Sequence, residues 1–197
     1  MRTLILARHG ESAFSVRRLA NGDPAAPGPL TEQGQTEARA LGEALAPTPI
    51  DLCATTRFER TRETADLALA GRTVPRIVVP ELDDIRVGEY EGRTVDDYRR
   101  WAHGCSPTEA CPGGGESRVE ALERFVRGFR MLLDRPEGTV LHVGHSLPIR
   151  YVLSAALEED PRPVMGLVEY AHPYTLDADA FARAVARLER WIGAPAW

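Results

Sequence analysis

Short apolar runs alternate with longer stretches of helical periodicity along the chain. Four runs of apolar, β-branched or thiol-bearing residues are typical of buried strands: residues 3–7, 51–54, 76–79 and 139–143. Apolar positions spaced three or four apart predict helices over residues 32–45, 58–69, 117–133, 147–157 and 179–192. This strand-then-helix order favours an α/β fold with three layers, in which helices cover both faces of a mostly parallel central sheet.

Composition narrows the class of protein. The chain has 197 residues, 43% of them hydrophobic and 27% charged, and a formal net charge of −5. These values are typical of a folded soluble protein, and we expect a single domain over residues 1–197. A negative net charge disfavours a broad nucleic-acid face, and no stretch reaches the roughly 18 apolar residues that span a bilayer.

Composition and net charge also indicate the location and the partners of the protein. We expect a cytoplasmic protein with a small-molecule substrate and neither a nucleic-acid nor a membrane partner. The oligomeric state stays open, with a homodimer as one option. Cys53, Cys105 and Cys111 are odd in number and lack metal-like spacing, which favours three reduced thiols. A disulfide between Cys105 and Cys111 is the alternative.

Two histidines stand at the carboxyl ends of predicted strands. Arg8 and His9 end the first strand, and His145 ends the last of the four. Each histidine has a glycine beside it, so the backbone there can turn sharply. Ligands of such sheets bind beyond the strand ends. Ser146 is expected to cap the following helix, whose first amides would then point toward an anion.

A further cation follows the second predicted strand. Arg60 lies on the opening turn of the next predicted helix, where it can face the same crevice. Two arginines and two histidines around an empty site would be costly. A phosphoryl group would instead receive charge-assisted, bidentate hydrogen bonds from them. The pattern therefore predicts a phosphate site built from Arg8, His9, Arg60 and His145. The other histidines have no metal-ligand spacing, so we expect no metal and no cofactor.

Six segments of the chain, in order, resemble the histidine phosphatase superfamily, which includes the cofactor-dependent phosphoglycerate mutases. One such match would be weak, but six in family order are specific. The segments are residues 8–12, 28–34, 60–65, 82–92, 113–117 and 143–150. The resemblance implies a phosphoglycerate mutase-like fold.

The resemblance also implies catalytic roles. His9 would attack phosphorus and become phosphohistidine. Arg8, Arg60 and His145 would hold the phosphoryl oxygens and neutralise developing charge. Asp84 aligns with the proton donor of the leaving group, which is glutamate in many family members.

Other roles implied by the resemblance are less sharply placed. Asp83 and Glu89 lie close to Asp84 in sequence and are the alternative proton donors. Glu116 is expected at the pocket edge or at the start of a helix. Ser146, which stands where the family commonly has glycine, is expected among the substrate-binding groups. Residues expected at positions where the family contacts substrate are Arg17, Arg18 and Asn21.

Residues and resemblance together predict a metal-independent phosphomonoesterase of the histidine acid phosphatase type. The alternatives are a mutase, a catalytically silent phosphate-binding relative and, least favoured, a metal hydrolase. Only about 60 residues separate Asp84 from His145, which favours an open site and hydrolysis over mutase chemistry. The substrate stays open, because specificity is expected in residues 13–29, in residues 93–115 and in the C-terminal segment, where no family pattern is recognisable.

Overall fold

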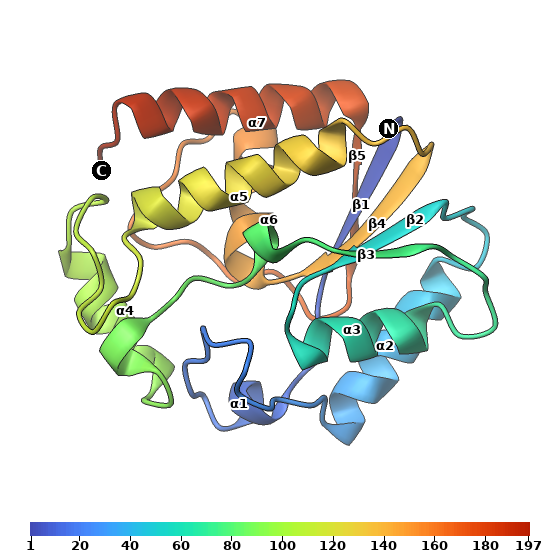
Figure 1. The fold of residues 1–197 in the computed structure, drawn as a ribbon, viewed down its shortest axis with the longest axis horizontal. Helices are drawn as coiled ribbons and strands as arrows, with labels where there is room; N and C mark the ends of the chain where they lie inside the picture. The colour runs from blue at the N-terminus through green and yellow to red at the C-terminus, as the bar shows by residue number, and fades with distance from the viewer.

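The computed structural model describes all of residues 1–197 and contains one five-stranded sheet with the order β3-β2-β4-β1-β5. The first four strands are parallel to their neighbours, and β5 pairs with β1 in the antiparallel direction. Helices cover both faces of this sheet, so the predicted three-layer, mostly parallel architecture is confirmed (Figure 1). The strands are β1 (Thr3–Arg8), β2 (Leu52–Thr55), β3 (Arg76–Val78), β4 (Thr139–Gly144) and β5 (Pro173–Asp177).

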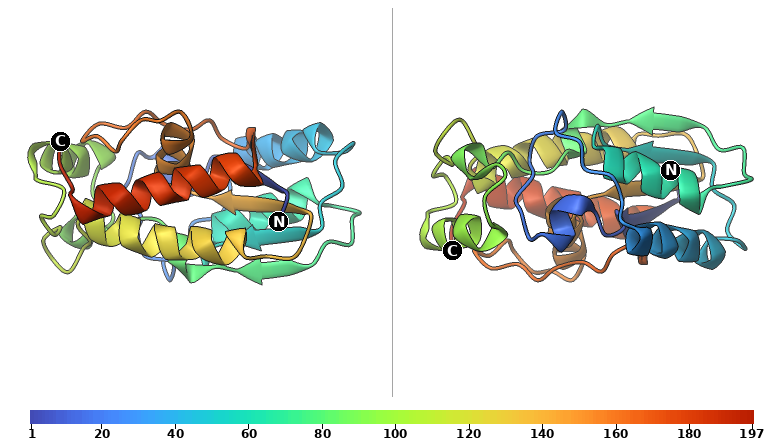
Figure 2. Two further views of the ribbon diagram at one scale, coloured as in Figure 1. Left: turned by 90° about the horizontal axis from the view of Figure 1, so that it is seen from above. Right: turned by 90° about the horizontal axis from the view of Figure 1, so that it is seen from below.

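The helices divide between the two faces. Figure 2 shows α5 and α7 lying together on one face, with α2 and α3 on the opposite side of the sheet. All five predicted helices are present within one or two residues of their expected ends, whereas α1, α4 and two 3-10 turns were not predicted. The helices are α1 (Ala13–Val16), α2 (Glu32–Ala44), α3 (Glu59–Ala68), α4 (Val95–Gly104), α5 (Arg118–Leu133), α6 (Ser146–Ala156) and α7 (Ala178–Gly193), and the 3-10 turns are Pro80–Leu82 and Gly88–Tyr90.

Alternation along β1 explains why its sequence is apolar throughout. Leu4 and Leu6 are buried in the larger core cluster with α5, α6 and α7. Ile5 and Ala7 are buried in the smaller cluster with α2 and α3. Successive side chains of a strand point to opposite faces, so a strand covered on both sides needs apolar residues at every position.

One expectation about the sheet needs correction. Residues 76–79 were expected to be a buried strand, but β3 is an edge strand in which Arg76 and Val78 are exposed. It pairs only with β2 and therefore has one uncovered side. The C-terminal segment, where no family pattern is recognisable in the sequence, supplies the fifth strand, β5. Its residues are only partly covered because it is the opposite edge, so it has no continuous apolar run.

The register of β1 and β4 brings the two histidines together. Arg8 pairs with Gly144 across the parallel ladder, and the backbone N–H of His9 donates to the Gly144 carbonyl at 3.0 Å. Gly10 and Gly144 are required for close packing, because a Cβ atom would lie 2.4 Å from Gly34 O and from His142 Nε2 respectively. Neither has a positive φ, so their role is space and not the sharp turn that the sequence suggested.

Two further properties bear on the setting. No helix combines the length and the apolar character needed to cross a bilayer. The three cysteines are free, and Cys53 and Cys111 are buried.

Candidate active site

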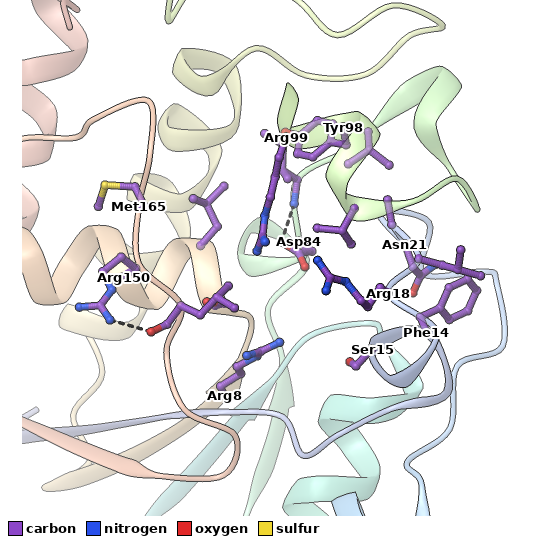
Figure 3. Close-up of a pocket in the computed structure, with 18 of the residues that line it drawn as sticks. Arg8, Phe14, Ser15, Arg18, Asn21, Asp84, Tyr98, Arg99, Arg150 and Met165 are labelled. Carbon is purple, nitrogen blue, oxygen red and sulfur yellow. Dashed lines mark hydrogen bonds between the residues drawn. The ribbon is translucent and has the colours of Figure 1, made fainter. Parts of the chain in front are cut away.

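A cavity of about 500 Å³ opens beyond the carboxyl ends of β1 and β4 (Figure 3). Its floor includes Arg8, His9, Arg60 and Asp84, and His145 lies directly behind them, fully buried. The structure therefore brings together the five residues for which the sequence implied catalytic roles. We call these five residues the floor of the pocket.

His9 is held as a neutral imidazole with one unprotonated nitrogen. Its Nδ1 lies 2.7 Å from the carbonyl oxygen of Gly10, which can only accept, so Nδ1 carries the proton. The opposite nitrogen, Nε2, consequently has a lone pair, and Arg60 Nε donates to it at 3.2 Å. Burial lowers the pKa of His9 well below its usual value, and the charges of Arg60 and Arg8 lower it further. The ring is thus ready to act as a nucleophile.

Arg60 is fixed from three directions. One terminal nitrogen donates to the side-chain oxygen of Asn21, and the other lies 3.3 Å from the Asn21 carbonyl and 3.4 Å from His145 Nδ1. Its guanidinium also lies over the ring of Phe58 at 4.2 Å. Burial lowers the pKa of Arg60 to about 10, which the charge of Asp84 opposes, so the guanidinium stays charged at neutral pH.

Arg8 connects the floor to the C-terminal segment. It donates to the carbonyl of Val168 at 2.9 Å, and its guanidinium lies 3.8 Å from the centre of the Tyr170 ring. Its Nε is buried and has no partner. Burial lowers the pKa of Arg8, and Tyr170 and then Asp84 oppose that effect. An anion in the pocket would supply the missing acceptor.

His145 and Asp84 face each other at the back of the floor. His145 Nε2 lies 2.9 Å from the Thr56 hydroxyl, and its Nδ1 lies 3.6 Å from a carboxylate oxygen of Asp84. Burial lowers the pKa of His145 well below its usual value, and Arg60 lowers it further. Burial raises the pKa of Asp84, although Arg60 opposes that rise. A carboxyl with a raised pKa beside the reacting group has the property that a general acid needs.

The other two carboxylates considered as proton donors lie elsewhere. Asp83 is buried against Arg57, to which it is bonded at 2.6 Å, and it also accepts from the Arg57 backbone. Glu89 is exposed in the turn Gly88–Tyr90. Neither lines the cavity, so Asp84 is the carboxylate that the fold directs into it.

Glu116 is not at the pocket edge. It is buried and binds Arg124 at 2.7 Å and Arg86 at 3.4 Å, and it accepts from the Arg86 backbone. It does not cap α5 either, because Ser117 and Glu120 form the capping box there. A buried carboxylate with two guanidinium partners fastens the loop before α5 to the body of the protein.

Three further expectations are changed by the structure. Ser146 does not cap α6, because the cap position is His145; the Ser146 hydroxyl lines the pocket and accepts from Val168 N at 3.0 Å. Arg17 lies outside the cavity and bonds to the Ala13 carbonyl. Arg18 lies on the rim, exposed and paired with an aspartate of α4 at 2.9 Å. Asn21 does line the cavity, where it holds Arg60.

The outer part of the pocket comes largely from the segments in which specificity was expected, although most of its individual residues were not assigned from the sequence. α4 contributes Val95, Tyr98, Arg99 and His103, whose three- and four-residue spacing places them on one face of the helix. That spacing was readable in the sequence but is short and mostly polar. Other unassigned members include Arg118, Leu147, Arg150, Met165, Leu167 and Tyr170.

The comparison with protein families now fits this geometry. The model of the histidine phosphatase superfamily (branch 1) matches residues 4–188. The chain belongs to this superfamily. The resemblance inferred from six ordered segments is therefore confirmed.

The proteins similar in sequence include phosphatases and phosphoglycerate mutases. The adenosylcobalamin/alpha-ribazole phosphatase of Salmonella typhimurium is 38% identical over 137 residues, 66% of each chain. The alignments with three such phosphatases span 64–66% of those relatives' length, just under two thirds. The 2,3-bisphosphoglycerate-dependent phosphoglycerate mutase 2 of Gloeobacter violaceus is 29% identical, over 91% of this chain and 87% of its own.

Solved structures agree with the fold. The alpha-ribazole phosphatase from Shigella flexneri superposes with a TM-score of 0.73 at 27% identity, over 89% of this chain and 90% of its own. A mycobacterial glucosyl-3-phosphoglycerate phosphatase in complex with VO3 gives 0.71 at 26% identity, over 89% and 92%.

Proposed function

We propose that the protein is a metal-independent phosphomonoesterase that works through a phosphohistidine on His9. The observation that carries this proposal is the state of His9: a buried, neutral ring whose unprotonated Nε2 accepts a hydrogen bond from Arg60 in an arginine-lined pocket. Such a nucleophile is suited to an anionic electrophile, because the arginines neutralise the charge that would otherwise repel it.

The first half-reaction moves the phosphoryl group to the enzyme. Arg8 and Arg60 bind the phosphoryl oxygens, and Arg60 Nε exchanges His9 Nε2 for one of these oxygens. Nε2 then attacks phosphorus while the bond between phosphorus and the ester oxygen breaks. Asp84 gives its proton to the departing oxygen, so that an alcohol leaves and Asp84 becomes a carboxylate.

The second half-reaction restores the enzyme. Water attacks the phosphorus of phosphohistidine, the phosphorus–nitrogen bond breaks, and Asp84 takes a proton from the water. His145 lies beside both Asp84 and Arg60. Because its ring is neutral, Nδ1 can accept a hydrogen bond from either of these two groups. Inorganic phosphate leaves, and His9 is again neutral with a free Nε2.

Relatives support hydrolysis of a phosphate ester. Two of the phosphatases similar to this chain act, by their names, on alpha-ribazole and glucosyl-3-phosphoglycerate esters, and one of them was solved with VO3. The finer assignment, a histidine acid phosphatase-type monoesterase located in the cytoplasm, is also our proposal. Its cytoplasmic part is supported by three free cysteines, two of them buried.

A mutase is the second candidate, because the Gloeobacter relative aligns with 91% of this chain. Two assays separate the candidates. Release of inorganic phosphate from a panel of esters in excess chelator supports the proposed hydrolase, while isomerisation of 3-phosphoglycerate with a bisphosphoglycerate primer supports the mutase. Acid-labile label on the wild-type protein but not on His9→Ala, after mixing with labelled ester, tests the phosphohistidine itself. Turnover that is lost in chelator would contradict the metal-independent mechanism.

A further inference from the structure

The pocket holds far more positive than negative charge. Six arginines line it, and Asp84 is its only carboxylate. Arg8 and Arg60 serve the phosphoryl group that is transferred. Arg18 is neutralised by an aspartate of α4, and Arg150 is bound by the carbonyls of residues 166 and 167. Two arginines remain for which the transferred group offers no explanation.

These two, Arg99 and Arg118, are absent from all ion pairs of the chain. Figure 3 shows Arg99 extending from α4 into the pocket. Arg118 donates to the Tyr151 hydroxyl at 3.3 Å, while its Nε is buried and has no partner. An arginine in a partly closed cavity is costly to leave without an acceptor, because it loses water without gaining a charged bond.

Two further residues of α4 lie beside these arginines. Tyr98 is only 8% exposed, and its hydroxyl is buried without a hydrogen-bond partner. His103 lies one turn further along the same face of α4, and burial lowers its pKa, as do the charges of Arg118 and Arg99. These four side chains from α4 and the start of α5 thus line the main pocket, where Asp84 is the only carboxylate. Glu109 and Glu116 line only the small cavity beside Tyr98 and Arg118, and Glu116 is already paired with Arg124 and Arg86.

A bound water would not remove this deficit. A cavity of about 10 Å³ lies beside Tyr98 and Arg118, which is room for roughly one water. Water there could accept from the Tyr98 hydroxyl and from Arg118 Nε. It could not neutralise either guanidinium, and neither Arg99 nor His103 lines that small cavity.

We propose that Tyr98, Arg99, His103 and Arg118 form a second anion subsite, and that the substrate is a phosphate ester carrying a second acidic group. A carboxylate and a second phosphate share the required chemistry, since each accepts two hydrogen bonds from a guanidinium. This inference rests on the proposed phosphatase function and adds the class of substrate. Eleven of the 26 lining residues are hydrophobic, so the body of that substrate meets an apolar surface.

Matched substrates test the subsite. Alkyl phosphates of increasing length are compared with esters of the same length that end in a carboxylate or a second phosphate. One charge-assisted hydrogen bond contributes about 1.5–3 kcal/mol, so kcat/KM for the acidic ester should exceed that of its alkyl counterpart by at least about tenfold at one length. A preference for either acidic group supports the subsite and identifies the group. Equal or lower kcat/KM for the acidic ester at every length overturns it.

Substitutions then locate the preference. Arg99→Met and Arg118→Met should each lower the ratio of kcat/KM for the acidic ester to that for the alkyl ester by about tenfold, mainly through KM. Arg100→Met and Arg127→Met are matched controls, because both arginines are exposed on the same helices outside the pocket. Arg99 has no ion pair to lose, so its variant keeps the test valid if Arg118→Met unfolds on losing its bond to Tyr151.

Different results would contradict the phosphatase function and the second anion subsite. Absence of hydrolysis with every ester, nitrophenyl phosphate included, would remove the phosphatase function and the subsite together. Hydrolysis of nitrophenyl and alkyl phosphates without an acidic preference would remove the subsite alone. An acidic preference that survives in both Arg99→Met and Arg118→Met would place the recognising group elsewhere.

Discussion

The floor of the pocket and its outer wall are built in different ways. Floor residues come from the ends of β1 and β4, the first turn of α3 and the loop that contains Asp84. They lie against one another: Arg60 bonds to His9 and lies 3.4 Å from His145, and His145 lies 3.6 Å from Asp84. The wall comes from α1 and the residues after it, from α4, the start of α5 and α6, and from residues 163–170. Two of its arginines, Arg99 and Arg118, have no acidic partner. The floor is organised before substrate arrives, as phosphoryl transfer requires.

The difference separates chemistry from selection. A floor variant should impair phosphate esters with equally basic leaving groups to a similar degree, because every ester presents the same phosphoryl group. A wall variant should instead change the ranking of substrates. Substitutions in the floor test the first of these expectations, and the matched esters test the second.

His9→Ala should give the largest loss. Removal of the nucleophile leaves the arginines but nothing to accept the phosphoryl group, and losses of about 10³-fold or more are expected for every ester. His172→Ala is the control, because His172 has a side chain that is 53% exposed and lies outside the cavity. Steady-state rates with nitrophenyl phosphate provide the measurement. A variant that retains more than a few per cent of the wild-type rate would mean that another residue attacks phosphorus.

Arg60→Lys should cost on the order of 10²-fold in kcat/KM although the charge is kept. Lysine is a point charge and cannot contact two phosphoryl oxygens while also bonding to Asn21, as the planar guanidinium does. Arg62→Lys on the same helix is the matched control, since Arg62 is exposed. A rate within a few-fold of wild type would show that Arg60 supplies charge alone.

The same division explains what the sequence could predict. His9 and His145 each follow a buried apolar strand, and parallel strands place their carboxyl ends at one edge, so the encounter of both histidines with Arg60 followed from local pattern. Tyr170 reaches the pocket from a loop, and Arg118 reaches it from the start of a helix. Neither position is marked by a periodic pattern in the sequence. Their positions depend on contacts such as Arg8 with Tyr170, which are set by tertiary packing.

The errors have the same origin. Strand β5 and the exposed face of β3 lie at sheet edges, where one side is uncovered and polar residues are tolerated, so apolar runs fail as a guide. Glu116 was placed at the pocket by its motif, but its side chain turns toward Arg124. A motif fixes where the backbone passes. It does not fix which charged neighbour a side chain meets.

Asp84→Asn tests the floor's general acid by comparing leaving groups. Alkoxide departure needs a proton, whereas nitrophenolate is a weak base and leaves unaided. Because general acid catalysis contributes about 10²–10⁴-fold, the defect with alkyl phosphates should exceed that with nitrophenyl phosphate by at least tenfold. Equal defects would assign Asp84 another role. Asp83→Asn is the comparison variant, and it should affect stability through Arg57 and leave the ratio unchanged.

The pH dependence of the rate should follow from the shifted pKa values of Asp84 and His9. Asp84 must be protonated to donate, and its raised pKa keeps it protonated to higher pH than an ordinary aspartate. The rate with alkyl phosphates should therefore fall as pH rises through that pKa, and Asp84→Asn should lack this alkaline limb. His9 must be neutral to attack, and its lowered pKa keeps it neutral to lower pH, so the acid limb lies below the usual histidine range. An acid limb at or above that range would contradict a buried neutral His9.

The smallest expected effect concerns Glu91, a residue that acts through its neighbours. Its carboxylate accepts from the Asn21 side chain at 3.0 Å and from Gly22 N at 2.8 Å, and Asn21 in turn accepts from Arg60. Glu91→Gln keeps the size and removes the charge, so a loss of about three- to tenfold in kcat/KM is expected for all esters. Glu89→Gln is the control, because Glu89 is exposed and does not line the cavity.

A double-mutant cycle shows whether that loss reaches the floor through Arg60. If Glu91 acts by holding Asn21 against the guanidinium, its substitution in an Arg60→Lys background should cost much less than in the wild type, since the contact to be held is already gone. Equal costs in both backgrounds would make Glu91 a residue of general stability, which a lowered melting temperature would accompany. A smaller cost in the Arg60→Lys background, with the melting temperature unchanged, would extend the preorganised floor to a third layer of residues behind the phosphate.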